Sequence, residues 1–415
     1  MPVIKPFRAL KPQPHLADKV AALPYDVMDT AEAREMAKGN PYSFLHVDKA
    51  EIDLEPGIDL YDPRVYQQAR DNLNKMIATG TFIQDKQQNY YIYRQIMKDH
   101  VQTGLVATVS VDDYLNNSVK KHEYTRQEKE QDRIKHVDCC NAQTGPIFLT
   151  YRARQEIDAI IDSCVATHSP LYDFVAEDGV SHIAWVIDDS NIIQELTAAF
   201  TRLDSLYIAD GHHRCAAAVK VAQQRRQANP NYSGLEEFNY FLAVIFPDNQ
   251  LQIMDYNRVV KDLNGLSTAE FLDKIATKFV VEMCPDNCPC RPEQKNKFGM
   301  YLQGQWYRLN ARPETLAGLD LVAGLDVSIL QDNILAPILG IADPRTDARI
   351  DFVGGIRGLA ELERRVNEGM AVAFALYPTT IHEVMTIADA GQVMPPKSTW
   401  FEPKLRSGLF IHLLD

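Results

Sequence analysis

The residues best suited to chemistry form three short motifs that lie far apart in the chain. The sharpest is the segment 210–214, Asp-Gly-His-His-Arg, which follows the apolar run 206–209 and precedes an Ala-rich helical stretch. Unpaired N–H groups in the first turn of a helix, with the positive end of its dipole, form a binding site for anions. Gly211 allows close backbone approach, and Arg214 can donate twice to phosphate. The motif predicts a phosphate site; the alternative is that Asp210 only caps the helix.

The second motif is the charged segment 120–133, in which His122 and Glu123 precede a predicted helix over 126–140. A His-Glu pair in a loop, with Arg126 close behind, suits a general base accompanied by phosphate ligands. For the charged residues of the helix itself, the alternative is a solvated face with ion pairs four residues apart. We therefore expect His122 and Glu123 to be functional, and the later acidic residues to be structural.

The third motif is the Pro-bounded tail 394–408. Its residues that suit phosphate or carboxylate binding are Lys397, Ser398, Thr399 and Lys404. Local positive charge in a chain of net charge −13 is most useful beside an anion. The tail is therefore predicted to return to the site, and removing it after Val393 is predicted to weaken ligand binding more than stability. The alternative is that the tail only packs along the surface of the protein and binds no ligand.

Apolar periodicity alternates between helix and strand along the whole chain, which predicts a mixed α and β protein. The patterns predict helices over 31–38, 65–78, 126–140, 155–166, 215–227, 328–339 and 359–367. They predict strands over 90–96, 103–111, 146–151, 172–176, 181–187, 206–209, 240–246, 350–353 and 371–376, with a hairpin over 298–309. Both charged motifs lie near the middle of the chain. We therefore expect three segments, 1–100, 101–248 and 249–415.

The composition of the 415 residues excludes several classes of protein. The 43 Lys and Arg against 56 Asp and Glu, without a basic tail, disfavour nucleic acid as a partner. The apolar runs are too short for a membrane span, and the N-terminus lacks the apolar core of a secretory signal, so we expect a cytoplasmic protein. Cys284, Cys288 and Cys290 lack a fourth ligand at zinc-site spacing, and no residue is assigned to a metal.

Taken together, several motifs resemble the DUF1015 family. They are 40–47 (NPYSFLHV), Lys121-His122-Glu123 with Thr125-Arg126 and Lys129-Glu130, the segment 210–214, and the tail 396–404. The strand, turn and helix around 210–214 also resemble the nucleotide site shared by ParB, sulfiredoxin and the ADP-dependent free-serine kinase. This chain departs from ParB in lacking an Arg-rich turn and a helix-turn-helix, and from sulfiredoxin in having His212 where the reactive Cys would stand.

The resemblance implies a ParB/sulfiredoxin-like nucleotide-binding core elaborated by N-terminal and C-terminal α/β segments. It implies that Glu123 is the base, with His122 and His213 as further catalytic candidates. The residues it assigns to the nucleotide are Asp210, Gly211, His212, His213, Arg214, Arg126, Lys397, Ser398, Thr399 and Lys404.

The expected function is a cytoplasmic phosphotransferase that uses ADP or ATP, with Mg²⁺, and a small hydroxylated metabolite such as serine or phosphoserine. Phosphoryl transfer asks the protein mainly for position and positive charge, which these motifs can supply. One alternative is a nucleotide-gated binding protein without turnover. Another is a metal-dependent phosphohydrolase built on His122, Glu123, Asp210 and His212. The choice of nucleotide, the acceptor and the oligomeric state, a homo-oligomer included, stay open at this stage.

Overall fold

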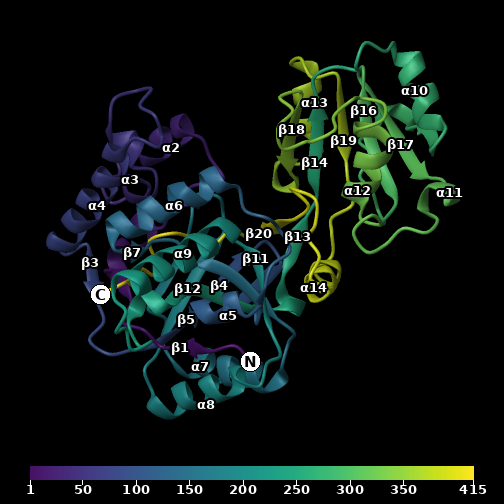
Figure 1. Cartoon of the computed structure of the whole chain (residues 1–415). Helices are drawn as coiled ribbons and strands as arrows, with labels where there is room; N and C mark the ends of the chain where they lie inside the picture. The colour runs from purple at the N-terminus through teal and green to yellow at the C-terminus, as the bar shows by residue number, and fades with distance from the viewer. The chain divides into compact units, whose positions relative to one another are not determined.

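The computed structural model describes residues 1–415, the side chain of Asn287 excepted, and the chain divides into two compact units (Figure 1). The first unit comprises residues 1–121, 125–251 and 403–415, and the second comprises 122–124 and 252–402. The division expected at residue 100 falls inside the first unit, where β4 (Tyr90–Met97) and β5 (His100–Ser110) pair as neighbouring strands. The division expected at residue 248 lies next to the point where the chain enters the second unit.

A nine-stranded sheet forms the centre of the first unit, in the order β6, β11, β8, β12, β5, β4, β10, β9, with β1 also paired to β5. Its other strands are β1 (Ile4–Lys5), β6 (Val119–Lys120), β8 (Ile147–Tyr151), β9 (Tyr172–Val175), β10 (Ser181–Ile187), β11 (Leu206–Asp210) and β12 (Tyr240–Pro247). The pairs β6 with β11 and β8 with β12 are parallel, and the other pairs are antiparallel. The central strands β8 and β12 are buried almost throughout, as strands covered on both faces must be.

The helices of the first unit are α1 (Ala17–Val20), α2 (Thr30–Ala37), α3 (Leu45–Asp48), α4 (Pro63–Ala78), α5 (Val111–Leu115), α6 (Gln127–Cys140), α7 (Gln155–Thr167), α8 (Ser190–Phe200) and α9 (His212–Ala228). Helix α9 is buried on two sides. Cys215 and Ala218 pack in the core of the sheet, while Ala217 and Val221 pack against Ile134 of α6. Small side chains let the helix approach both neighbours closely, which explains the Ala-rich composition that predicted it.

The C-terminal segment 403–415 is built into the first unit. Strand β21 (His412–Leu413) pairs with β7 (Ala142–Gln143), while β2 (Leu10–Pro12) pairs with β3 (Phe82–Gln84). The backbones of Ile411 and Leu10 bond to each other in both directions, and Leu409, Phe410 and Ile411 are almost fully buried. The tail therefore contributes to the core as well as carrying Lys404.

The second unit contains a six-stranded antiparallel sheet in the order β15, β17, β16, β19, β14, β18. These strands are β14 (Tyr256–Val260), β15 (Phe279–Met283), β16 (Lys297–Leu302), β17 (Gln305–Ala311), β18 (Ile350–Gly354) and β19 (Val372–Ala375), and a separate pair joins β13 (Gln252–Met254) to β20 (Trp400–Glu402). The helices are α10 (Thr268–Ala276), α11 (Pro313–Leu316), α12 (Asp326–Leu330), α13 (Leu359–Asn367) and α14 (Ile381–Asp389). A π-helical turn, Gln331–Leu335, continues α12.

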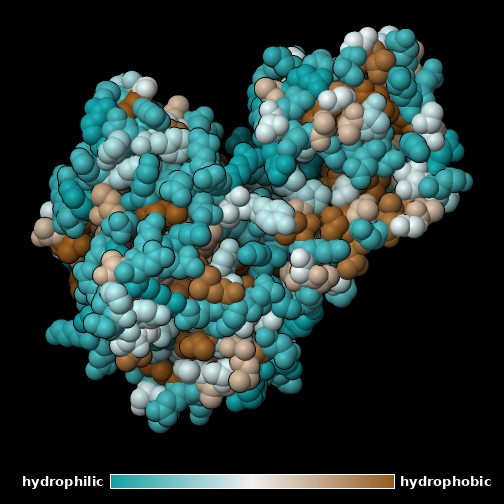
Figure 2. Space-filling view, in the orientation of Figure 1, coloured by the Kyte–Doolittle hydropathy of each residue, from teal (hydrophilic) through white to brown (hydrophobic). Residues whose placement is uncertain are grey.

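The mixed α and β fold predicted from the sequence is confirmed. The face of the molecule seen in Figure 2 is mostly hydrophilic with scattered apolar side chains, since the apolar residues are concentrated in the cores of the two units. Among the described residues, none of the helices combines the length and apolar character that crossing a membrane requires.

Candidate functional site

The turn after β11 places the Asp-Gly-His-His-Arg motif at the junction of a buried strand and the long helix α9. The pairing of β11 with β8 shifts register between Ile208 and Asp210, and such a bulge redirects the side chain that follows. Gly211 then adopts φ 90°, ψ 32°, and α9 begins at His212. A Cβ on Gly211 would lie 3.1 Å from the guanidinium of Arg214. Glycine is therefore needed both for the backbone conformation and for the room that Arg214 occupies.

Asp210 is shared by two cations. Its Oδ2 lies 3.7 Å from Nη2 of Arg214 and 3.4 Å from Nζ of Lys404, and both cationic side chains are only 10% exposed. Burial alone would raise the pKa of Asp210, but the charges of Lys404, Arg214 and His212 outweigh it and hold the pKa well below its usual range. Two cationic side chains, Arg214 and Lys404, therefore lie beside the N-terminus of α9.

One donor of Arg214 is buried without a hydrogen-bond partner in the described part of the chain. Its Nη1 donates to the carbonyl oxygen of Pro146, and its Nη2 faces Asp210. Its Nε is buried and has no hydrogen-bond partner within the described part of the chain. A buried donor without a partner is costly, so this N–H marks a position for the oxygen of a ligand or water.

The two histidines differ in role because neighbouring residues on a helix point about 100° apart. His212 is buried, at 7% exposure. His213 is half-buried, and its Nε2 accepts a hydrogen bond of 3.0 Å from the backbone N–H of Arg126. As an acceptor at Nε2, the ring is neutral with its proton on Nδ1. His213 thus ties the first turn of α9 to the start of α6, while the Arg126 side chain is exposed.

The loop 121–126 leaves the sheet beside this turn. β6, which precedes it, is the parallel neighbour of β11, with Val119 opposite Leu206. The last residue of the loop, Arg126, is the N-cap of α6, and the hydroxyl of Thr125 donates to Glu130 at 2.8 Å. Both ends of the loop are therefore fixed beside the elements that flank the turn.

Five predicted site residues belong to the second unit: His122, Glu123, Lys397, Ser398 and Thr399. His122 is buried, at 2% exposure, and its carbonyl oxygen accepts from the N–H of Met394 at 2.8 Å. Glu123 and Thr399 are half-buried and Lys397 is exposed. The loop before His122 and the tail before Lys397 are thus joined by a backbone hydrogen bond.

The loop 395–399 is held by buried polar groups of the second unit. Nη2 of Arg258 donates to the carbonyl oxygen of Lys397 at 2.9 Å, and the hydroxyl of Thr379 donates to that of Ser398 at 2.9 Å. The hydroxyl of Ser398 itself donates to the carbonyl oxygen of Pro395 at 2.6 Å. The hydroxyl of Ser398 therefore stabilises the loop conformation, whereas the side chain of Lys397 is exposed to solvent.

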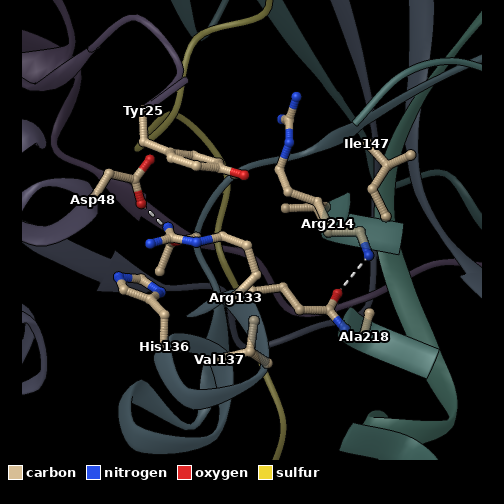
Figure 3. A pocket seen from close by; sticks show the side chains of 12 residues that line it. Tyr25, Asp48, Arg133, His136, Val137, Ile147, Arg214 and Ala218 are labelled. Atoms are coloured by element: carbon tan, nitrogen blue, oxygen red, sulfur yellow. Dashed lines mark hydrogen bonds between the residues drawn. The ribbon is translucent and has the colours of Figure 1, made fainter. Parts of the chain in front are cut away.

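A cavity of about 30 Å³ lies on the other side of Arg214 in the first unit (Figure 3). Its polar lining comes from Tyr25, Asp48, Arg133, His136, Gln143, Thr144 and Arg214. The guanidinium of Arg133 lies 4.0 Å from the centre of the Tyr25 ring. Figure 3 shows the Tyr25 hydroxyl directed toward Arg214, which therefore borders both the turn and the cavity.

No motif in the sequence indicated this cavity. Arg133, which was not singled out as a site residue, is buried and pairs with Asp132 at 2.7 Å. Tyr25 and Asp48 lie in a loop and a short helix with no distinguishing spacing. One feature of the sequence could have indicated the buried pair. Asp132 and Arg133 are adjacent and oppositely charged inside a helix, whereas ion pairs on an exposed helix face usually join residues three or four apart.

The described residues include no group of three or more His, Cys, Asp or Glu side chains arranged to hold a metal ion. Asp210, the carboxylate nearest the turn's N–H groups, already lies between two cations. Mg²⁺ is commonly bound by substrate phosphates with only one or two carboxylates. The described residues of this turn therefore do not form a metal cage.

A family model described as "Protein of unknown function (DUF1015)" matches residues 4–328. No match is found among curated proteins. Among solved structures, free serine kinase in complex with AMP is similar at 14% identity and a TM-score of 0.38, over 74% of this chain and 91% of that one. A conserved hypothetical protein from Pyrococcus furiosus is 14% identical, with a TM-score of 0.37 over 74% and 95%. SbnI with a C-terminal truncation, from Staphylococcus aureus, is 11% identical, with a TM-score of 0.40 over 74% and 87%.

Proposed function

The chain belongs to the DUF1015 family, and we propose that it is a nucleotide-dependent phosphotransferase whose phosphate site is the turn 210–214. The observation that carries the proposal is the sharing of Asp210 by Arg214 and Lys404 at the first turn of the 17-residue helix α9. Two cationic side chains, N–H groups and the helix dipole favour an anion with several oxygens. The terminal phosphates of ADP or ATP have this chemistry.

Glu123 is the base in this proposal. The loop that carries it is fixed at one end by the pairing of β6 with β11, and at the other by the hydrogen bond from Arg126 to His213. Parallel neighbouring strands end at the same edge of a sheet, so the loop after β6 and the turn after β11 leave that edge together. A carboxylate in this short loop suits proton removal from a substrate hydroxyl.

The reaction balances with these groups. The acceptor oxygen forms a bond to the terminal phosphorus, and the bond from that phosphorus to the bridging oxygen breaks. The proton of the acceptor hydroxyl passes to Glu123, and AMP leaves from ADP, or ADP from ATP. Arg214 and Lys404 stabilise the charge that develops on the phosphates, which is the main demand of phosphoryl transfer. Mg²⁺, when bound to the phosphates, would neutralise part of the same charge.

The remaining predicted residues have smaller roles. His122 and His213 stay candidates for proton transfer, and exposed Lys397 and Thr399 stay candidates for phosphate contacts. Ser398 is proposed to act through the shape of its loop, since its hydroxyl donates to Pro395. The acceptor is proposed to be a small hydroxylated metabolite in the cytoplasm, with serine and phosphoserine as the first compounds to test.

The test is ³¹P NMR of the purified chain with ADP or ATP, Mg²⁺ and a panel of hydroxylated metabolites. A phosphorylated acceptor is the expected result. Free phosphate without an acceptor would indicate the hydrolase, and binding without either product would indicate the nucleotide-gated switch. Either of these outcomes would contradict the proposed transferase activity.

A matched pair of glycine variants makes this test specific. Gly211→Ala forces a side chain into φ 90° and against Arg214 at 3.1 Å. Gly179→Ala imposes a similar backbone strain at φ 79°, but nothing lies within 4 Å of its added Cβ. We expect only Gly211→Ala to abolish nucleotide binding. Equal loss in both variants would mean that strain, and not the arrangement of Arg214, explains the effect.

A further inference from the structure

We propose that Gln95 is a positioning residue of the phosphate site: it holds the backbone of Lys404, so that the ammonium group of this lysine lies at the first turn of α9. The inference rests on the proposed function, because it explains how one of the two cations of that site is placed. The two residues are 309 positions apart in the chain, and both belong to the first unit.

Three buried polar side chains form a row across the nine-stranded sheet. His182 of β10 lies directly opposite Gln95 of β4, and Gln95 lies directly opposite Gln102 of β5. Residues that are directly opposite each other in neighbouring strands point to the same face of the sheet. The exposed fractions of the three side chains, in that order, are 1%, 0% and 0%. Because a buried polar group is costly without a hydrogen bond, this polar row needs partners on its face of the sheet.

The C-terminal tail supplies partners for the polar row. Nε2 of Gln95 donates to the carbonyl oxygen of Lys404 at 2.8 Å, and Nε2 of Gln102 donates to Oε1 of Gln95 at 2.9 Å. Two residues after Lys404, Nε of Arg406 donates to Nε2 of His182 at 3.2 Å. The tail is therefore held by its backbone at residue 404 and by a side chain at residue 406.

The contact at residue 406 anchors the tail as a whole. The guanidinium of Arg406 is buried and also pairs with Asp178. Burial and the charge of Arg406 lower the pKa of His182 to about 3, so this ring is neutral at pH 7 and can accept a hydrogen bond. Its other nitrogen, Nδ1, lies 2.7 Å from the hydroxyl of Tyr93. Gln95, in contrast, contacts the backbone of the very residue that carries the cation, and it is therefore the residue to test.

Lys404 needs this support because its side chain is flexible. A lysine ammonium is carried on a stem of four carbons with rotatable bonds, so its position depends on where the backbone is held. Nζ of Lys404 lies 3.4 Å from Oδ2 of Asp210, and the side chain is only 10% exposed. The residue thus contacts Gln95 through its carbonyl oxygen and Asp210 through its ammonium group. Removing the amide of Gln95 would loosen the backbone and let the ammonium group move away from the turn.

The experiment measures the placement of Lys404 separately from nucleotide binding. Acetylation of the folded chain with acetic anhydride, followed by peptide mass spectrometry, reports the reactivity of Lys404 without any ligand, with the 73% exposed Lys38 as internal reference. Calorimetry gives the Kd for ADP. The variant is Gln95→Met, which keeps the length of the side chain and removes its amide. The control is Thr108→Val, which removes another fully buried hydrogen bond of the same sheet, from the Thr108 hydroxyl to the carbonyl oxygen of Lys5 at 3.0 Å.

A second variant guards against misfolding. Gln95→Met leaves the amide of Gln102 without its acceptor, and a buried donor without a partner is destabilising. Gln95→Met combined with Gln102→Met removes both amides, and replacing both partners of a hydrogen bond by apolar groups of similar shape can be nearly neutral. Thermal melting shows which of the two variants is folded, and that variant is used in both measurements.

We expect Gln95→Met to raise the acetylation rate of Lys404 relative to Lys38, and to raise the Kd for ADP, each about twofold to tenfold, which is the effect of one intramolecular hydrogen bond. Thr108→Val should change neither quantity. In the Lys404→Met background, Gln95→Met should leave the Kd for ADP unchanged, because a positioning residue acts only through the residue that it positions. An equal rise of the Kd in both backgrounds would mean that Gln95 acts on the fold in general, and it would refute the inference.

The two measurements also distinguish this inference from the proposed function. If the wild-type chain binds ADP and Gln95→Met changes neither the acetylation of Lys404 nor the Kd, the positioning role is refuted and the phosphate site stands. If the reactivity of Lys404 depends on Gln95 but the wild-type chain binds no ADP, the placement of Lys404 by Gln95 stands and the proposed function fails.

Discussion

Replacing Lys404 with Met keeps most of the apolar stem and removes the charge that Asp210 shares with Arg214. At an effective dielectric constant of about 20, the direct attraction of Asp210 to Lys404 at 3.4 Å is about 5 kcal/mol, and to Arg214 at 3.7 Å about 4.5 kcal/mol, before the opposing cost of desolvation. Asp210 therefore keeps nearly half of its attraction in the variant. The loss of stability should stay below the roughly 3 to 5 kcal/mol that isolating a buried charge costs.

The loss of ligand binding should be larger in proportion. Without Lys404, the turn loses one of its two cationic side chains and one charged donor to a phosphate oxygen. A hydrogen bond from a charged donor contributes roughly 1.5 to 3 kcal/mol, which corresponds to about a tenfold to a hundredfold rise in the Kd for ADP.

Calorimetry with ADP at low and moderate ionic strength measures this change, with thermal melting on the same samples. Lys404→Arg should retain most of the affinity. Lys5→Met is the matched control, since Lys5 pairs with Glu237 at 2.9 Å in the same unit and has no part in the turn. A folded Lys404→Met variant that binds ADP as tightly as the wild type would refute the reasoning.

Three further predictions concern the second unit. Glu123→Gln should lower kcat by about a hundredfold to ten-thousandfold with an unchanged Kd for ADP, and full activity by ³¹P NMR would remove Glu123 as the base. Ser398→Ala should lower thermal stability by about 1 kcal/mol, because its hydroxyl donates to Pro395, and leave ADP binding intact; the opposite pattern in melting and calorimetry would make the hydroxyl a ligand. Burial raises the pKa of Asp326 to about 7, so folding favours its protonated form and this group's effect on stability becomes unfavourable as pH rises from about 4 to about 7. Asp326→Asn should therefore raise the melting temperature at pH 8 and have little effect at pH 4. An equal rise in melting temperature at both pH values would show that the protonation of Asp326 does not affect stability.

The parts of the fold that local sequence determines were predictable. The helix expected over 359–367 has those bounds in the structure, and Ser267 caps α10 in a capping box with Glu270, three residues further on. The strand, turn and helix at 210–214 were predictable because an apolar run, a glycine and an Ala-rich stretch each favour one local conformation. These features depend on residues that are close together in the chain.

Features that depend on distant contacts were not predictable. The register shift at Ile208 depends on β8, and the cavity behind Arg214 is assembled from several separate segments. The tail shows the same limit: it was expected to matter more for ligand binding than for stability, yet Leu409 to Ile411 are buried and β21 pairs with β7. Removing it after Val393 would also remove this core packing. We therefore expect a large loss of stability, and the single substitution at Lys404 is the better test.

A crystal structure of the chain with ADP would show whether the turn 210–214 binds phosphates. We expect the terminal phosphate at the first turn of α9, within hydrogen-bond distance of the backbone N–H groups of Gly211 to His213 and of the side chains of Arg214 and Lys404. ADP bound elsewhere, with no phosphate beside Asp210, Arg214 and Lys404, would contradict this expectation.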